Sequence, residues 1–245
     1  HLTHDRPGAV QKFHDDPTPR VGGLAIFVGL LVAWFAVASR AVLDILQVLL
    51  LAGLPALVFG LLEDVTKRVG VLPRLMATMF SGALASMLTG VALTRLDVPL
   101  IDDWLAIGSV AVLFTAFAVG GVANAVNIMD GFHGLASGLV AIALAAIATV
   151  AASAGDAALA QVALLGAAAM AGFWLVNYPW GKIFLGDGGA YFAGFMLAWL
   201  AVLLPMRNPS VSPWTSLLIC GLPFIEVIYS AIRRMARRQS PGAPD

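Results

Sequence analysis

The sequence predicts an all-α protein, a polytopic bundle of transmembrane helices, and two observations lead to this prediction. Hydrophobic residues make up 60% of the 245 residues and charged residues 11%, with a mean hydropathy of +0.91, which soluble domains do not reach. Apolar runs of roughly 18 to 21 residues, long enough to cross ~30 Å of hydrocarbon, recur between short polar breaks. No linker separates two domains, so residues 1–245 are expected to form one integral membrane domain.

The apolar runs divide the chain into about eight predicted spans. Turn-forming residues separate several of them, because Gly, Asp, Asn and Pro at 153–156 and 205–209 do not continue a helix comfortably. The approximate limits of the spans are 22–39, 44–62, 73–93, 104–123, 135–152, 158–177, 188–205 and 214–232.

Charge and cysteine content exclude some classes of protein. The 14 basic residues are balanced by 14 acidic residues, so the chain as a whole does not attract nucleic acid. Cys220 is the single cysteine and therefore cannot form a disulfide within the chain.

Basic residues are distributed unequally between the loops. Successive spans cross the membrane in opposite directions, so alternate loops lie on the same side of it. On this count, all of the 14 Lys and Arg residues except Arg40, Arg95 and Arg207 lie on one side of the membrane. Because basic loops stay on the cytoplasmic side, that side is predicted to be cytoplasmic. The four histidines and three polar clusters, 63–64, 124–134 and 186–189, fall on the same side. This convergence predicts a site at the cytoplasmic membrane surface.

The central polar cluster lies between two apolar segments, where polar groups that lack partners are expensive. Asn124, Asn127 and Asp130 recur every three residues and share one face if the segment is helical. The pattern favours a functional site over a polar loop whose Asn and Asp side chains cap their own backbone. His133 either contacts a phosphate or substrate or is a surface histidine.

Two further carboxylate motifs each allow a structural and a functional interpretation. Glu63 and Asp64 end the second span, either as a solvated helix end or as a functional pair, since adjacent carboxylates oppose the helix dipole there. Asp187 stands between glycines just before an apolar helix. It either caps that helix or holds Mg²⁺ against a phosphate bound at the helix N-terminus.

The ordered set of motifs resembles the polyprenyl-phosphate N-acetylhexosamine-1-phosphate transferases, which form glycosyltransferase family 4. The resemblance covers nearly the whole chain and is greater to the branch of the undecaprenyl-phosphate GlcNAc-1-phosphate transferases than to the peptidoglycan branch. The matching segments are 14–23, 60–64, 124–136, 177–179, 182–189 and 233–234.

The resemblance implies a transferase of the bacterial inner membrane that is multi-pass and has its active site on the cytoplasmic side. Undecaprenyl phosphate would attack the sugar-linked phosphate of a UDP-N-acetylhexosamine and release UMP, with Mg²⁺ required, or Mn²⁺ in its place. The product would start a lipid-linked surface glycan such as lipopolysaccharide O antigen. The expected partners are these two substrates and the bilayer, without nucleic acid, and a homodimer is left open.

Other functions stay open at this point. A phospho-MurNAc-pentapeptide transferase is the alternative within the family, and a non-catalytic paralogue is another. A transporter is the alternative outside it, although its carboxylates should lie near the bilayer midplane.

The resemblance also implies roles for single residues. Asp187 and Asp130 would ligate Mg²⁺, and Asp130 would also act in catalysis. Asp64, with Glu63 beside it, would deprotonate or orient the lipid phosphate. Substrate binding is expected of His14, Arg20, Asn124, Asn127, His133, Lys182 and Gly186.

The chain departs from the family pattern at three places. Glu63 replaces the usual first Asp of a pair, and His133 replaces a second Asp in the central motif. By the family pattern, a span before residue 1, a His-rich loop after Arg238 and a last span are expected to lie outside this chain. The chain is therefore expected to be a fragment of a ten- or eleven-span protein.

Overall fold

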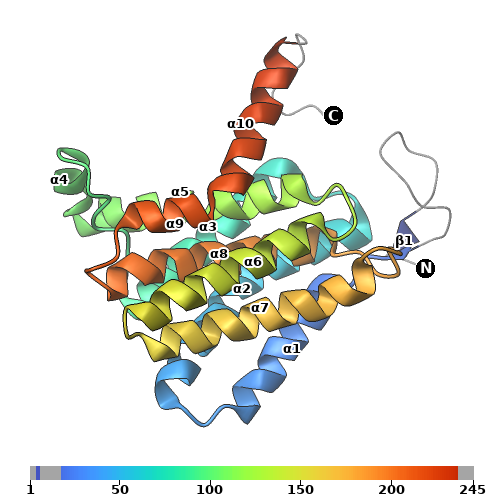
Figure 1. Cartoon of the computed structure of the whole chain (residues 1–245). Helices are drawn as coiled ribbons and strands as arrows, with labels where there is room; N and C mark the ends of the chain where they lie inside the picture. Colours follow the sequence, from blue (N-terminus) through green and yellow to red (C-terminus); the bar gives the residue numbers. More distant parts are fainter. Residues whose placement is uncertain (1–3, 6–17, 237–245) are drawn as a thin grey trace.

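The computed structural model describes residues 4–5 and 18–236, and it confirms the all-α prediction (Figure 1). A short antiparallel pair, β1 (His4–Asp5) with β2 (Thr18–Pro19), precedes the bundle. The helices are α1 (Gly22–Ala36), α2 (Arg40–Thr66), α3 (Val71–Thr89), α4 (Ile101–Leu105), α5 (Gly108–Met129), α6 (Leu135–Ser153), α7 (Ala157–Asn177), α8 (Gly186–Arg207), α9 (Pro213–Ile219) and α10 (Gly221–Ala236).

Six of the helices are long and apolar enough to cross a membrane, namely α2, α3, α5, α6, α7 and α8, and α1 is a shorter apolar helix. They match the first seven predicted spans within a few residues at each end. The protein is therefore a multi-pass membrane protein.

The last predicted span, 214–232, is not one continuous helix. It divides at Cys220 into α9 and α10, and α10 points away from the bundle (Figure 1). Pro223 explains the break, because proline has no N–H to donate to the carbonyl of Ile219 one turn earlier. The predicted span was based on the apolar character of the segment, which does not reveal the effect of a single proline on helix hydrogen bonding.

Helix α8 is the core of the bundle. Nearly every residue of its apolar stretch is buried, and Phe192, Phe195 and Trp199 are fully enclosed. Helices α1, α2, α5 and α6 all pack against it. A helix that is apolar on every side is buried among other helices or faces lipid, and α8 is almost entirely buried among its neighbours.

The start of α8 touches its neighbours through backbone atoms. A Cβ placed on Gly23 of α1 would lie 2.4 Å from Gly189 Cα, and one placed on Gly60 of α2 would lie 2.4 Å from Gly188 Cα. Small residues allow such close approach of helices in a membrane. These four glycines therefore fix the place where α8 begins.

Different polar contacts close the two ends of the bundle. At one end, Arg207 donates two hydrogen bonds to Asp156, of 2.6 and 2.9 Å, and these hold the pKa of the Asp156 carboxyl below its usual range. At the other end, the three polar clusters predicted to share a membrane face do come together. We refer to this second end as the site face.

We expect Gly23→Ala to destabilise the protein by about 1–3 kcal/mol, because the added methyl group has no space against the α8 backbone. Gly29→Ala on the same helix is the matched control, since nothing lies within 4 Å of its Cβ position. Thermal unfolding of the purified proteins in detergent measures both. A midpoint for Gly23→Ala as high as that for Gly29→Ala would contradict the backbone contact.

Candidate active site

Asp64 of α2 caps the N-terminus of α8. Its Oδ1 accepts a hydrogen bond from the N–H of Asp187 at 3.1 Å, and its Oδ2 accepts one from the N–H of Gly188 at 3.0 Å. Asp64 is only 1% exposed. The N–H groups that begin a helix lack partners within it, and here a carboxylate from another helix supplies them. The N-terminus of α8 is thus already bound to an anion of the protein itself.

Gly186 fits between Asp64 and the entry to α8. Its φ of +73° lies in the left-handed region, and a Cβ there would lie 2.6 Å from Asp64 Oδ2. Only glycine meets both conditions. The residue predicted to bind substrate therefore shapes the capping contact.

Basic residues surround the Asp64 carboxylate. Arg20 Nη1 lies 3.7 Å and Lys67 Nζ 3.8 Å from its Oδ1. The backbone of Arg20 pairs with that of Phe184 in an isolated bridge, and the N–H of Gly22 donates to Phe184 O at 3.0 Å. The segment before α1 is thus attached to the loop before α8, and both contribute to the site face.

Glu63 has a different role from its neighbour. Its Oε2 accepts a hydrogen bond of 2.8 Å from the N–H of Val69 and so fixes the turn between α2 and α3. The adjacent carboxylates predicted to act as a pair therefore contact different parts of the backbone.

Asp187 forms an ion pair with Arg74 of α3. The Arg74 guanidinium also lies 6.0 Å from the ring centroid of Tyr191, and its Nε donates to Gly70 O at 3.3 Å. Arg74 belongs to none of the motifs that the sequence indicated. The signal was its position just inside a predicted span, because a charge at the edge of an apolar helix is expensive and marks a candidate site.

Asp130 ends α5 close to the other two aspartates. The pKa of its carboxyl is raised to about 7, chiefly by burial and also by the charges of Asp187 and Asp64, while Arg20 opposes the increase. The residue is half-buried. Asp64, Asp130 and Asp187 thus interact electrostatically although they come from different parts of the chain.

The predicted helical face of the central motif is confirmed, since α5 runs to Met129. Asn124 connects helices: its Nδ2 donates to Thr78 Oγ1 of α3 at 3.0 Å and to Gly120 O at 2.8 Å. Asn127 is half-buried one turn later, next to Asp130. This face of α5 therefore contacts α3 at Asn124 and ends at Asp130. We refer to Asp64, Asp130 and Asp187 as the acidic cluster.

Asn177 connects the loop after Asp130 with the loop before Asp187. Its Oδ1 accepts a hydrogen bond from the N–H of Gly134 at 2.5 Å, and its Nδ2 donates to Ile183 O at 2.7 Å. Asn177 is 5% exposed, so both bonds are shielded from water. One side chain thus sets the spacing of two carboxylate-bearing segments.

His133 supports the same pair of loops. Its Nδ1 lies 3.4 Å from Pro179 O, its ring is 5.2 Å from that of Phe184, and a Cβ on Gly181 would lie 2.4 Å from it. Lys182 is exposed, with its Nζ 5.4 Å from the ring of Trp180. His14, the remaining predicted substrate-binding residue, lies outside the described residues.

The acidic cluster suits Mg²⁺ only in part. Within residues 4–5 and 18–236, no three His, Cys, Asp or Glu side chains converge closely enough to hold a metal. Magnesium in phosphate-handling sites is held by one or two carboxylates, with water and substrate phosphate as the other ligands. Asp130 and Asp187 supply suitable oxygens, and Asn127 lies beside them. These residues fit a cation that arrives with a phosphate-bearing substrate, not one enclosed by protein.

Comparison with known proteins identifies the family of this chain. A family model described as Glycosyl transferase family 4 matches residues 46–205. A probable undecaprenyl-phosphate N-acetylglucosaminyl 1-phosphate transferase of Bacillus subtilis is 31% identical over 240 residues, which are 96% of this chain and 65% of the relative. The undecaprenyl-phosphate alpha-N-acetylglucosaminyl 1-phosphate transferase of Yersinia pestis is 28% identical over 98% of this chain and 66% of its own length. The chain thus spans just under two thirds of these relatives.

We expect Asn177→Ala to destabilise the protein by about 2 kcal/mol or more, because a buried N–H and a buried carbonyl lose their partner. Thr149→Ala, which removes an exposed hydroxyl bonded within α6, is the control and should change little. Thermal unfolding in detergent compares the two. Equal midpoints would mean that Asn177 does not hold the loops together.

Asp130 should make stability depend on pH. Its folded pKa, about 7, lies above the ordinary 3.8, so the folded state binds the extra proton between these values. The free energy of unfolding that Asp130 contributes therefore falls as pH rises through this window. The test compares the thermal unfolding midpoint of wild type with that of Asp130→Asn in EDTA. The wild-type midpoint, relative to that of the variant, should fall as the pH is raised from about 5 to about 8.

Asp44→Asn, on the exposed Arg40–Asp44 pair at the other end of α2, provides the comparison for this pH series. A difference between wild type and Asp130→Asn that stays flat or rises with pH would contradict the assignment.

Proposed function

Because the chain belongs to glycosyl transferase family 4, we propose that it transfers an N-acetylhexosamine-1-phosphate from a UDP-sugar to undecaprenyl phosphate. A phosphate oxygen of the lipid attacks the sugar-linked phosphorus of the donor, the bond between the two donor phosphates breaks, and UMP leaves. The reaction takes place on the cytoplasmic side of the bacterial inner membrane, where the product starts a surface glycan such as O antigen.

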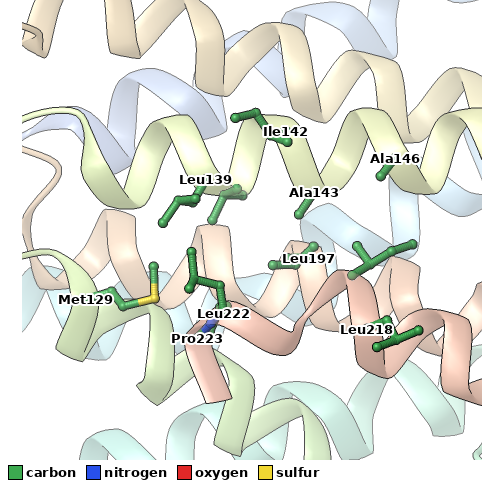
Figure 2. A pocket seen from close by; sticks show the side chains of 11 residues that line it. Met129, Leu139, Ile142, Ala143, Ala146, Leu197, Leu218, Leu222 and Pro223 are labelled. Carbon is green, nitrogen blue, oxygen red and sulfur yellow. The ribbon is translucent and has the colours of Figure 1, made fainter. Parts of the chain in front are cut away.

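One observation carries this proposal: the acidic cluster lies beside an apolar groove. A cavity of about 290 Å³ runs between α5, α6, α8, α9 and α10 (Figure 2). Leu139 and Ala143 line one side, and Leu197 and Leu222 line the other. Met129, which also lines it, directly precedes Asp130. An acceptor with a charged head and a long prenyl tail needs this combination of surfaces.

In this proposal Asp130 and Asp187 would hold Mg²⁺ against the diphosphate of the donor. Bound Mg²⁺ would supply positive charge for the oxygens of the transferring phosphate. Arg20 and Lys67, which face Asp64, add positive charge on the same face. This arrangement favours substrates that carry several negative charges at a membrane surface.

Asp64 is better suited to positioning than to proton transfer. It is buried and already accepts two backbone hydrogen bonds. A phosphate monoester is mostly ionised at neutral pH, since its second pKa is about 6, so the lipid head needs no strong base. The predicted role of Asp64 as a base stays a prediction, and its contacts support the placement of Asp187.

The test uses the purified protein with its natural flanking sequence, undecaprenyl phosphate, Mg²⁺ and a panel of UDP-N-acetylhexosamines, with UMP release as the readout. UMP formation with one donor, lost in EDTA, supports the proposal and names the sugar. Turnover of UDP-MurNAc-pentapeptide instead would assign the protein to the peptidoglycan branch. No UMP from any donor, while a relative works alongside, would support a non-catalytic protein.

Asp187→Asn should lower the turnover number by about 10²-fold or more, because an amide holds a cation poorly and places no negative charge beside it. The fold should persist, since Asp64 caps α8 through backbone N–H groups that this change leaves in place. Asp103→Asn in α4, at the other end of the bundle, is the control. Near-normal turnover by Asp187→Asn would remove Asp187 from the metal site.

A further inference from the structure

Arg74 and Asp187 form an ion pair that is mostly withdrawn from solvent. The side chains are 15% and 19% exposed, and the pair joins α3 to the first turn of α8. The attraction between the two charges is screened less than in an exposed pair, and the desolvation of both charges offsets part of this gain. The ion pair is therefore a defined part of the site.

Charge balance explains why an arginine lies there. Asp64 has Arg20 and Lys67 beside it and two backbone N–H donors. Arg74 is the cation that contacts Asp187 directly. It neutralises the carboxylate that the proposed reaction needs for a metal.

A divalent cation and Arg74 cannot both approach Asp187 closely without repelling each other. A carboxylate has lone pairs enough for both, but an Arg charge and a doubly charged ion a few ångströms apart repel strongly in a partly buried site. Resting on the function proposed above, we infer that Arg74 is a placeholder cation, which a divalent ion displaces from Asp187 when it binds.

The surroundings of Arg74 give the displaced guanidinium a place to remain. The Tyr191 ring lies 6.0 Å from it, and Gly70 O accepts from its Nε, neither of which involves Asp187. Held near the site by these contacts, the guanidinium is free to bind the diphosphate of the donor, since arginine matches phosphate oxygens with two parallel bonds. The cation and the diphosphate would then bind cooperatively.

The competition is tested by binding of Mn²⁺ alone, followed by electron paramagnetic resonance on the purified protein in detergent. Arg74→Gln should bind Mn²⁺ at least about fivefold more tightly than wild type, because the competing charge is gone. Arg74→Lys keeps the positive charge, so its affinity for Mn²⁺ should lie between those of wild type and Arg74→Gln. Arg68→Gln is the matched control, since Arg68 is an exposed arginine in the turn just before α3, and its Mn²⁺ affinity should stay within about twofold of wild type.

Asp187→Asn in the Arg74→Gln background shows whether the gain acts at Asp187, and it should abolish the tighter binding. Unchanged or weaker Mn²⁺ binding by Arg74→Gln, or a gain that survives Asp187→Asn, would overturn the inference. The absence of Mn²⁺ binding in every variant would overturn it too. Because the assay contains no sugar donor or lipid acceptor, its outcome is separate from that of the UMP-release experiment.

Discussion

The capping of α8 by Asp64 is the interaction on which the rest of the site depends. It brings a buried carboxylate from α2 to the first N–H groups of the central helix. The contact is possible only because Gly60 and Gly188 let the two backbones meet, and Gly186 leaves space for the carboxylate itself. A charge withdrawn from water is retained only when hydrogen bonds and basic groups compensate it, as they do here. The position of Asp187 follows from this contact.

Once α8 is fixed, the other acidic residues are placed by loops that are attached to one another. Asn177 spaces the loop after Asp130 against the loop before Asp187, and His133 fills the space beneath Gly181. The resulting negative charge is offset by arginines from elements far apart in sequence, Arg20 before α1 and Arg74 in α3. Positive and negative side chains thus offset each other in the site, and the proposed metal would take the place of Arg74 beside Asp187.

The sequence predicted the helices well because hydrophobic length is a local property: the predicted span 135–152 became α6 within one residue at either end. It also predicted which clusters share a face, since that follows from counting spans. It did not predict that Asp64 would cap α8, because the partner N–H groups belong to a helix more than one hundred residues later. Asn177 was noticed only as part of a motif, since the pairing between distant loops leaves no local pattern. Arg74 was not singled out, although its charge just inside a predicted span is a local signal.

The break between α9 and α10 connects the chemistry of the site face to the lipid phase. Pro223 interrupts the hydrogen bonding one turn after Ile219, and α10 points away from the bundle instead of continuing α9 (Figure 1). Leu218 of α9 and Leu222 of α10 line the apolar groove together with Leu139 of α6. Met129, which directly precedes Asp130, lines it too. In the proposed reaction, the prenyl chain of the acceptor would lie in this groove, next to Asp130.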